Sequence, residues 1–332
     1  MQEDVWKYFT REHHKAFLLS LELLGNTDWP EQKQLRCLYA VSRRIDSYYT
    51  RFSIPKPDGT ARELLAPNPF LKRIQRNILR NILEKLPVSP YATAYRRGAG
   101  ILKNASPHTG QKRILKLDIR RFFDSIPFYM VYSYAFPRIY YPPSVAVLLT
   151  HLCCYQEYLP QGAPTSAAIS NLVMKPFDEY IGRWCGERGI IYTRYCDDIT
   201  FSGDFDPAPV IRKARGFLSS MGFELNQKKT KVMDCASRQS VTGIVVNEKP
   251  QIFREYRNAL RQELYYCEKY GVDSHLQRIY GDRLPIEPER KQRYLRSLSG
   301  RINYLLQINP EDAYYLRARD RIREIGEQKA AE

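Results

Sequence analysis

The 332-residue sequence predicts a mixed α/β (α+β) fold and is long enough for two or three packed units. Residues 113–119 (RILKLDI) alternate apolar and polar side chains, as expected for a strand that ends in a carboxylate. Residues 190–203 predict two short β runs joined by a tight turn. Residues 70–86, and the chain from 254 onward, repeat apolar residues at three- to four-residue spacing, which predicts helices.

The remaining elements follow from equally local patterns. Residues 1–50 place apolar side chains at helical spacing, which predicts an N-terminal helical segment. Residues 54–67 contain two extended runs around an Asp-Gly pair, a typical hairpin turn. The helix over 70–86 has a basic open face, which suits either solvation or phosphate contact. Residues 250–332 hold 16 basic and 13 acidic residues, and this near balance predicts a separate helical subdomain.

Composition excludes several classes of protein. With 43% hydrophobic and 27% charged residues, the chain is neither a disordered tail nor a membrane-spanning protein, and no apolar run approaches a membrane span. The N-terminus carries acids where a signal peptide has a basic region, which predicts a chain that is not exported. Seven cysteines without a CxxC pair predict reduced thiols. We therefore expect a cytoplasmic protein that does not contact a membrane.

The charge distribution predicts a polyanionic partner. Lys and Arg number 52 against 36 Asp and Glu, a net charge of +16. Residues 51–121 alone hold 16 basic and 4 acidic residues. Such a concentrated basic surface attracts nucleic-acid phosphates through Coulomb steering and counterion release. The alternative is a charged face that only keeps the protein in solution.

Three carboxylates are candidates for a metal site. Asp118 ends a predicted strand, and the adjacent Asp197 and Asp198 lie in a predicted hairpin turn. Neighbouring carboxylates repel one another unless a cation lies between them, and Mg²⁺ prefers carboxylate, phosphate and water oxygens. Two such ions about 3.5–4 Å apart stabilise the attacking and leaving oxygens in phosphoryl transfer. An Asp-Asp pair taken alone is more often an ordinary turn.

The motifs around these carboxylates carry a more specific signal. In chain order they are KPDGTAREL (56–64), LDIRRFFDSI (117–126), LPQGAPTS (159–166), IIYTRYCDDITF (190–201) and GFELNQKKTKV (222–232). In this order and spacing, the set resembles the reverse transcriptases. The resemblance covers the larger part of the chain.

The resemblance implies a right-hand polymerase fold. Mixed α/β fingers would occupy residues 51–112, following the N-terminal helical segment 1–50. A palm with an antiparallel sheet and flanking helices would occupy 113–247. A helical thumb, which we expect to recognise RNA, would occupy 250–332. Nothing in that last region resembles an RNase H domain or a zinc endonuclease.

Site residues are carried over from the family's motifs. Asp118, Asp197 and Asp198 become the catalytic carboxylates, and together with the backbone carbonyl of Ile119 they would bind two Mg²⁺ ions, with Mn²⁺ able to substitute. The residues implied to bind the incoming nucleotide are Lys56, Arg62, Phe123, Gln161, Gly162 and Lys229. Phe123 takes the place of the aromatic gate that excludes a ribose 2′-OH. If the backbone there is extended, Phe122 and Phe123 point to opposite faces, one into the core and one to the nucleotide.

Two shorter motifs resemble those of retron reverse transcriptases, namely NASPHTG (104–110) and VTGIVVN (241–247). We expect Asn104 and His108 to shape the RNA path, although a histidine hydrogen-bonded within a loop is the simpler interpretation. In the thumb, Arg317 and Arg321 are candidate RNA contacts, and the alternative is a solvated helix. Cys196 departs from the alanine usual in the YxDD turn but keeps a small side chain.

A retron enzyme would bind its own structured non-coding RNA and prime from the 2′-OH of an internal guanosine. It would use dNTPs to make branched multicopy single-stranded DNA. Its expected partners are a host RNase H and a separate effector protein, in antiphage defence. The alternatives are a diversity-generating or CRISPR-associated reverse transcriptase, and a catalytically idle nucleic-acid-binding scaffold.

Overall fold

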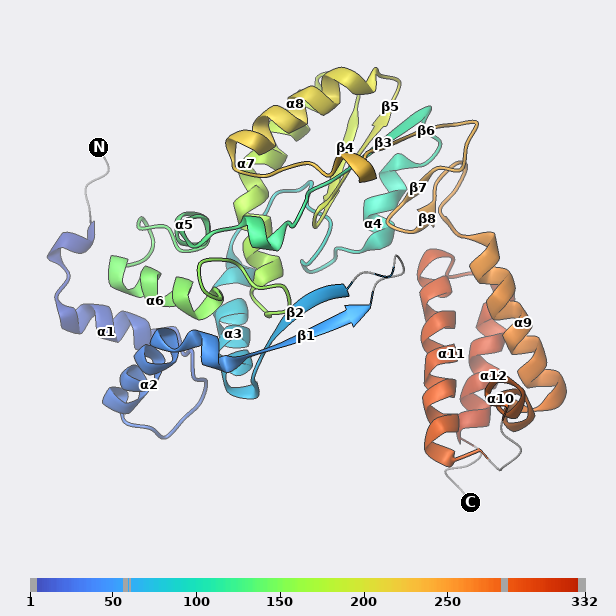
Figure 1. Cartoon of the computed structure of the whole chain (residues 1–332), viewed down its shortest axis with the longest axis horizontal. Coiled ribbons are helices and arrows are strands. Elements are labelled where there is room, and N and C mark those ends of the chain that lie inside the picture. Colours follow the sequence, from blue (N-terminus) through green and yellow to red (C-terminus); the bar gives the residue numbers. More distant parts are fainter. Residues whose placement is uncertain (1–4, 56–58, 60, 282–285, 328–332) are drawn as a thin grey trace. The chain divides into compact units, whose positions relative to one another are not determined.

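The computed structural model describes residues 5–55, 59, 61–281 and 286–327. The chain divides into two compact units. Unit 1 comprises Met1–Gly100 and Lys112–Val232, and unit 2 comprises Ile101–Gln111 and Met233–Glu332 (Figure 1). These divisions differ from the domain boundaries inferred from sequence, because a short segment between the fingers and palm motifs packs with the C-terminal region. The assignment of fingers, palm and thumb stays a prediction.

Unit 1 begins with helices, as the apolar spacing predicts. A short 3₁₀ turn η1 (Val5–Tyr8) precedes α1 (Arg11–Ser20) and α2 (Glu31–Arg43), and η2 (Ile45–Tyr48) follows. Thr10 caps α1, since its hydroxyl accepts a hydrogen bond from the His13 backbone N–H at 3.4 Å. These helices pack with α6 (Pro143–Cys153), an apolar helix whose side chains are mostly buried. The N-terminal helical segment is therefore part of the body of unit 1.

The predicted hairpin and basic helix come next. Strands β1 (Tyr49–Pro55) and β2 (Ala61–Pro67) pair antiparallel, and their outer halves are exposed. Asn68 then caps α3 (Pro69–Asn81), accepting a hydrogen bond from the Leu71 N–H at 2.9 Å. The apolar stripe of α3 is fully buried. The helix ends five residues before the predicted end, because Ile82 leaves helical geometry and a 3₁₀ turn, η3 (Leu83–Lys85), completes the segment.

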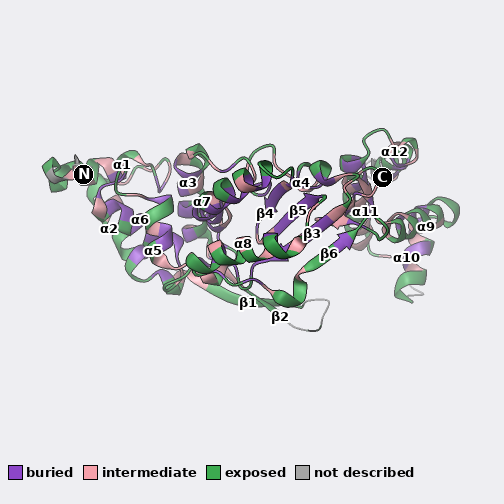
Figure 2. Cartoon of the chain, turned by 90° about the horizontal axis from the view of Figure 1, so that it is seen from above, coloured by how far each residue is buried: buried purple, intermediate pink, exposed green. Residues whose placement is uncertain are grey.

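A four-stranded sheet forms the centre of unit 1. Its strands are β3 (Arg113–Asp118), β4 (Ile191–Tyr195), β5 (Asp198–Gly203) and β6 (Lys231–Asp234), in the order β4-β5-β3-β6. The pairs β3–β5 and β4–β5 are antiparallel. Helix α7 (Ser166–Gly186) packs on β4, and α8 (Pro207–Ser220) packs on α7 (Figure 1). In Figure 2 the three strands β3, β4 and β5 are largely buried, so the sheet is a rigid base for the carboxylates at its end.

Short helical turns connect β3 to the helices behind it. They are η5 (Phe123–Ser125), α5 (Phe128–Met130) and η6 (Val131–Ala135), and a further turn, η7 (Gln227–Lys229), precedes β6. Most of the aliphatic side chains between these turns and α6 are fully buried. The segment after Asp118 therefore packs on the core of unit 1.

Unit 2 combines a small sheet with helices. Strands β7 (Ser240–Val241), β8 (Ile244–Val245) and β9 (Gln251–Ile252) are antiparallel, and α4 (Ile101–Ala105) with η4 (Ser106–His108) packs against them. The helices that follow are α9 (Arg254–Tyr270), α10 (Val272–Tyr280), α11 (Pro288–Ile308) and α12 (Ala313–Glu327). The apolar stripe predicted from residue 254 onward is buried between them. In the part of the chain that is described, no helix is both long and apolar enough to span a bilayer.

Candidate active site

Asp118 and Asp198 face each other at the end of the central sheet. Asp118 is the last residue of β3, Asp198 is the first residue of β5, and the register pairs them directly. Residues opposite each other in antiparallel strands have Cβ atoms about 4.5–5.5 Å apart. Two carboxylates at that separation repel each other, so the fold holds them together against their charge.

The third carboxylate lies in the turn that joins β4 to β5. This turn consists of two residues, Cys196 and Asp197, because Tyr195 already pairs with Asp198. Asp198 is therefore in the strand rather than in the turn, which corrects the sequence-based placement. Cys196 has a positive φ of 61°, as tight hairpin turns require of a central residue. Burial raises the pKa of its thiol to about 12, so the side chain stays neutral beside Asp197.

The backbone of Ile119 faces the same turn. Its N–H donates to the Asp197 carbonyl at 3.2 Å, while the neighbouring Asp118 carbonyl and Arg120 N–H bond to Asn226 and Glu224 on the other side. In extended backbone the C=O of a residue points to the same side as its N–H. The Ile119 carbonyl therefore faces the Asp197 turn, as the predicted metal ligand must.

Lys229 closes this group of residues. Its ammonium donates to Oδ1 of Asp118 at 2.7 Å, and the Asn226 amide donates to Oδ2 at 3.2 Å. The hydrogen bond to Asp118 is the main cause that raises the pKa of Lys229. The lysine that the sequence analysis placed near the nucleotide thus contacts Asp118, a predicted catalytic carboxylate, directly. Asn226 was not predicted, although it lies in the same motif.

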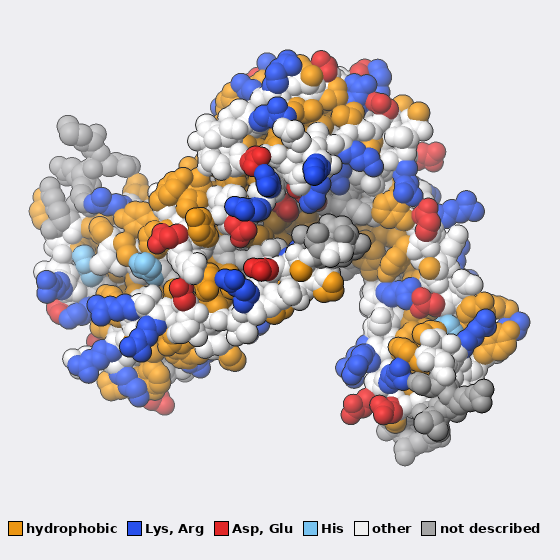
Figure 3. All heavy atoms as spheres, in the orientation of Figure 1, with side chains coloured by type: hydrophobic (Ala, Val, Ile, Leu, Met, Phe, Trp, Pro, Cys, Tyr) orange, Lys and Arg blue, Asp and Glu red, His pale blue; other side chains and the backbone are white. Residues whose placement is uncertain are grey.

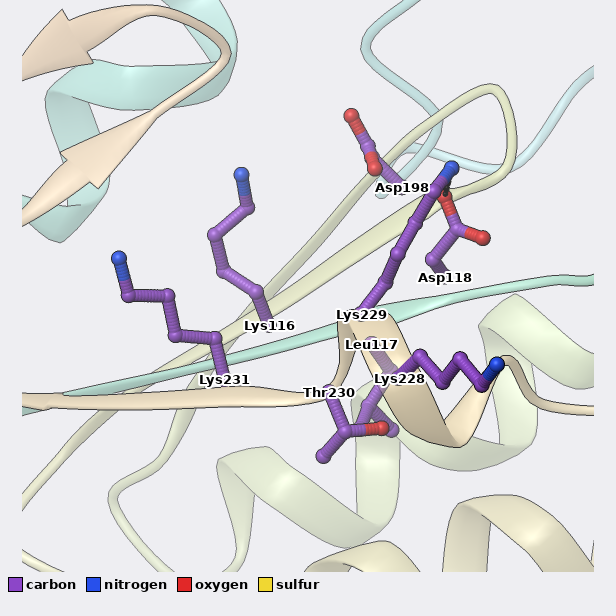
Figure 4. A pocket seen from close by; sticks show the side chains of 8 residues that line it. All are labelled: Lys116, Leu117, Asp118, Asp198, Lys228, Lys229, Thr230 and Lys231. Atoms are coloured by element: carbon purple, nitrogen blue, oxygen red, sulfur yellow. Dashed lines mark hydrogen bonds and ion pairs between the residues drawn. The ribbon is translucent and has the colours of Figure 1, made fainter. Parts of the chain in front are cut away.

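A pocket of about 370 Å³ opens beside Asp118 and Asp198. Four lysines line it, from β3, η7 and β6: Lys116, Lys228, Lys229 and Lys231. Figure 4 shows Lys229 reaching toward the two aspartates, whereas Lys228 points away from them. Figure 3 shows Lys and Arg side chains, with a few acids among them, over the part of unit 1 that contains this sheet. The pocket therefore suits an anionic group such as a phosphate.

Burial opposes ionisation of Asp197 and Asp198. It is the main cause that raises the pKa of Asp197, and the charge of Asp118 raises it further. Burial also raises the pKa of Asp198, where Lys116 acts in the opposite direction. A dication bound between these groups would favour their ionised forms.

The donor set suits a divalent cation by its chemistry. Three carboxylates and one backbone carbonyl are hard oxygen ligands of the kind that Mg²⁺ takes. Over residues 5–55, 59, 61–281 and 286–327, however, no three His, Cys, Asp or Glu side chains are grouped closely enough to hold a metal ion. The Lys229 ammonium lies against Asp118, on oxygen that a cation would use. A cation bound by Asp118 would share this carboxylate with the Lys229 ammonium.

The two phenylalanines after Asp118 separate into core and surface. Phe122 is 4% exposed and packs with Phe223, while Phe123 is half-buried at the start of η5. One ring is more buried than the other, as expected, but the two do not point to opposite faces. The backbone at Phe122 is helical rather than extended, with φ −48° and ψ −54°. The two rings contact each other, with centroids 5.4 Å apart, and Phe123 packs against the same core at its edge.

Gly162 lies where strand β2 approaches the LPQG loop. The Leu65 N–H donates to the Gln161 carbonyl at 2.9 Å. Gly162 has φ +128°, and a Cβ there would lie 2.7 Å from the Leu65 carbonyl oxygen. Glycine is therefore required at this position because a side chain would clash with the backbone of β2. This requirement is separate from any contact with a nucleotide. The half-buried Gln161 lies beside it.

Of the two basic residues predicted to bind the triphosphate from the β1–β2 hairpin, the structure describes only one. Arg62 is exposed on β2, opposite Ile54 of β1. Lys56 lies outside the described residues. The hairpin thus presents at least one guanidinium to solvent, and its role toward a triphosphate stays a prediction.

Asn104 and His108 are buried in unit 2 with no accessible surface. The Asn104 amide lies 3.4 Å from the Thr242 hydroxyl, and the Gly110 N–H donates to the Val246 carbonyl at 2.9 Å. The NASPHTG and VTGIVVN motifs therefore pack on each other. Neither side chain reaches the surface, so neither is placed to touch RNA directly, and a part in shaping the RNA path stays a prediction. The simpler interpretation of His108, as an internal loop histidine, agrees with its burial.

The VTG motif itself is a tight hairpin turn. Thr242 and Gly243 join β7 to β8 and both have positive φ, 46° and 80°. This is the type I′ pattern, which favours glycine. The strand entry with a turn glycine that the sequence suggests is therefore present.

The two arginines predicted to contact RNA lie on the outside of α12. Arg317 and Arg321 are both exposed, whereas Ala318 and Ile322 are buried against the other helices. Arg321 forms an ion pair with Glu268 of α9 at 2.7 Å. Arg317 is thus the better placed of the two for an external phosphate.

One functional group escaped the sequence analysis. Arg194, in the strand before the carboxylate turn, is fully buried and bonds to the turn from inside. The sequence did contain a signal for this role. Arg194 follows Tyr192 by two residues, so the two side chains point to the same face of a buried strand. A charged residue at such a position needs a buried partner.

Comparison with known proteins agrees with the motifs. Residues 54–263 match the family model described as "Reverse transcriptase (RNA-dependent DNA polymerase)". The chain is 35% identical to the "Retron Ec86 reverse transcriptase" of Escherichia coli over 263 residues, 76% of this chain and 81% of that protein. It is 34% identical to the "Retron Mx65 reverse transcriptase" of Myxococcus xanthus over 291 residues, 82% of this chain and 64% of the relative. Telomerase from Candida albicans aligns in structure with a TM-score of 0.45 at 10% identity, over 88% of this chain and 68% of that one.

Proposed function

Because the chain belongs to the reverse transcriptase family, and within it to the retron enzymes, we propose that it copies its own non-coding RNA into branched DNA. Members of the family are RNA-directed DNA polymerases. The observation that carries the catalytic part of the proposal is the meeting of Asp118, Asp197 and Asp198 at one end of a buried sheet. The retron part is supported by identity to retron enzymes over three quarters or more of the chain.

Asp118, Asp197 and Asp198, with the Ile119 carbonyl, would hold two Mg²⁺ ions, and Mn²⁺ would substitute. Bound there, the ions would lower the pKa of the primer hydroxyl and neutralise charge on the triphosphate. The contribution of the chain is to keep the three carboxylates fixed at the sheet end, so that none has to be ordered when substrate arrives.

Lys229 has a defined task in this scheme. Its ammonium rests on Asp118 in the free protein, 2.7 Å from Oδ1. With a cation on Asp118, the Lys229 ammonium would be available to the lysine-lined pocket and would bind the β- and γ-phosphates of a dNTP there. Lys56 and Arg62 of the hairpin would hold the same triphosphate from the fingers side, since a guanidinium binds phosphate through two hydrogen bonds.

Phe123 and the LPQG loop would select the sugar. Phe123 is half-buried five residues after Asp118, on a turn fixed by the buried Phe122. A ring in this place leaves no room for a 2′-OH and so favours dNTPs over rNTPs. Gln161 and Gly162 would line the opposite side, with their backbone fixed by β2.

The remaining partners follow from the retron assignment. The template would be a structured non-coding RNA, the primer the 2′-OH of an internal guanosine, and the product branched multicopy single-stranded DNA. A host RNase H would remove the copied template. A separate effector protein would act with the complex in antiphage defence, in the cytoplasm. RNA recognition would lie in the helices from residue 250 onward.

The nucleic acid that co-purifies with the protein tests this proposal. After expression with the neighbouring non-coding RNA, RNase treatment of the wild-type complex should leave branched DNA of one defined length. The Asp197→Asn variant, which preserves shape and removes one charge, should co-purify with RNA but no such DNA. Linear DNA, or no DNA from an active wild-type polymerase, would contradict the retron part. Failure of the purified wild type to extend any primer would contradict the polymerase itself.

A further inference from the structure

A buried ion pair lies directly behind the carboxylate turn. Arg194 of β4 and Asp178 of α7 are both fully buried. The guanidinium grips the carboxylate with two hydrogen bonds, from Nε to Oδ1 at 2.8 Å and from Nη2 to Oδ2 at 2.7 Å. The Tyr192 hydroxyl donates to the same Oδ1 at 2.7 Å. This two-pronged geometry fixes the plane and position of the guanidinium.

The remaining nitrogen of Arg194 is directed at the turn. Nη1 donates to the backbone carbonyl of Cys196 at 2.9 Å. That carbonyl belongs to the peptide unit that joins Cys196 to Asp197. Because a peptide unit is planar, holding its oxygen fixes the direction of the Asp197 N–H and narrows the φ range of Asp197. The orientation of the Asp197 carboxylate therefore depends on a charge inside the core.

Other contacts make Arg194 the meeting point of three segments. Nη2 also donates to the Asn171 side chain of α7 at 3.2 Å, and the Asn171 amide donates to the Ala94 carbonyl at 2.9 Å. The backbone carbonyl of Arg194 accepts hydrogen bonds from the N–H and hydroxyl of Thr93, at 2.8 and 2.9 Å. Helix α7 and the carboxylate turn are thus joined through the guanidinium, and the loop at 91–94 through Asn171 and the Arg194 backbone.

The energetics indicate a role other than stability. Removing two charges from water is costly, and apolar residues of similar volume often replace a buried ion pair without loss of stability. The Arg194–Asp178 pair also holds the backbone of the turn at Cys196, and the geometry of that turn is the reason we give for the pair. Cys196 has φ +61°, a conformation unfavourable for a side chain with a Cβ, so the turn needs an external hold.

We propose that Arg194, oriented by Asp178, is a positioning residue for the polymerase reaction, fixing the Cys196–Asp197 peptide and with it the Asp197 carboxylate. This inference rests on the proposed polymerase function. It assigns to the helix α7 a direct part in setting the catalytic geometry.

Hydrogen exchange and kinetics together test the proposal. Arg194→Lys keeps the charge toward Asp178 but loses the fork that reaches Cys196. We expect its kcat for primer extension to fall about 10- to 100-fold, with the KM for dNTP changed less than about threefold. The half-saturating Mg²⁺ concentration should rise, because one ligand is no longer held in place. The Ile119 amide, which donates to the Asp197 carbonyl, should exchange faster with solvent while α8 amides do not.

A second variant separates positioning from folding. Arg194→Met combined with Asp178→Leu replaces the pair by apolar side chains and is expected to stay folded. It should keep a melting temperature near that of the wild type and still lose kcat and Ile119 protection. Tyr192→Phe is the matched control, because it removes one hydrogen bond to Asp178 and leaves the bond to Cys196 intact. Its kcat should stay within about threefold of the wild type.

The outcomes distinguish the positioning role of Arg194 from the proposed polymerase function. Wild-type kcat and Ile119 exchange in folded Arg194→Lys or in the double variant would overturn the positioning role. So would a loss in Tyr192→Phe as large as that in Arg194→Lys. A wild-type protein that fails to extend primers would instead contradict the proposed function, and the exchange measurement would still report whether Arg194 holds the turn.

Discussion

The Lys229 ammonium lies 2.7 Å from Oδ1 of Asp118, although 111 residues separate them in the chain. Asp118 is almost fully buried, whereas the lysine side chain is 62% exposed. The contact therefore joins an exposed lysine side chain to a buried carboxylate. It is the main cause of the raised pKa of Lys229. We therefore expect different effects from substitution of the two basic residues of η7, Lys228 and Lys229.

Lys229→Met should lower the rate of primer extension by about 10- to 100-fold, because one positive charge facing the leaving phosphates is lost. Lys228→Met is the matched control. It removes the same charge from the same turn, yet the Lys228 side chain points away from Asp118 (Figure 4). Single-turnover extension with each variant measures the difference. Equal losses in the two variants would show that general charge, rather than the Asp118 contact, matters.

Asp197→Asn should reduce primer extension by about two orders of magnitude or more, since a lost metal contact is worth several kcal/mol to the transition state. RNA affinity should change little, because the substitution preserves shape. Extension assays with Mg²⁺ measure the rate of primer extension, and filter retention measures the affinity for RNA. Extension at the wild-type rate would remove Asp197 from the catalytic group.

Phe123→Ala should admit ribonucleotides while dNTP incorporation continues at a reduced rate, because the exclusion of a 2′-OH is steric. Phe122→Ala should leave sugar selection intact and instead destabilise the fold by about 3–4 kcal/mol, since Phe122 is 4% exposed. Competition between dNTPs and rNTPs, together with denaturant unfolding, measures both effects. Loss of discrimination in Phe122→Ala alone would reverse the two assignments.

His108 should make the stability of unit 2 depend on pH. Burial lowers its pKa to about 4, below the usual value near 6.5. Between these values the unfolded chain binds a proton that the folded chain does not, so stability should fall as pH decreases from about 6.5 to about 4. The ceiling of the effect is about 3 kcal/mol. Denaturant unfolding across this range should show the trend, and His108→Gln should flatten it. An unchanged slope in that variant would assign the pH dependence to other groups.

Arg317→Ala should weaken cognate RNA binding and reduce the salt dependence of binding by about one phosphate contact. Arg321→Ala should have a smaller effect, because Arg321 already pairs with Glu268. Titrations of both variants against the cognate RNA and an unrelated hairpin, over a range of salt concentrations, separate specific from general binding. A larger loss in Arg321→Ala would mean that the Glu268 pair opens when RNA binds.

Local patterns predicted the elements that carry the chemistry. The strand before Asp118, the tight turn at the YCDD motif and the apolar stripe of α3 are all present, although the strand is buried on both faces and Asp198 lies in β5 rather than in the turn. Their prediction succeeded because a strand, a tight turn or an amphipathic helix depends on side chains within a few positions of one another. Element ends were less certain, as the early end of α3 shows. The family followed from the order of motifs and is shown by the comparisons.

By itself, then, the sequence determined the family, the strand that ends at Asp118 and the hairpin that carries Asp197 and Asp198. Only the tertiary structure decided that Lys229 meets Asp118, that Gly162 lies against the Leu65 carbonyl, and that Asn104 and His108 face inward. It also placed the buried Arg194 guanidinium against the Cys196 carbonyl. For the buried polar groups the physical reason is the same. A polar or charged group is buried only where distant segments supply its partners, and those partners become neighbours through packing rather than through spacing in the chain.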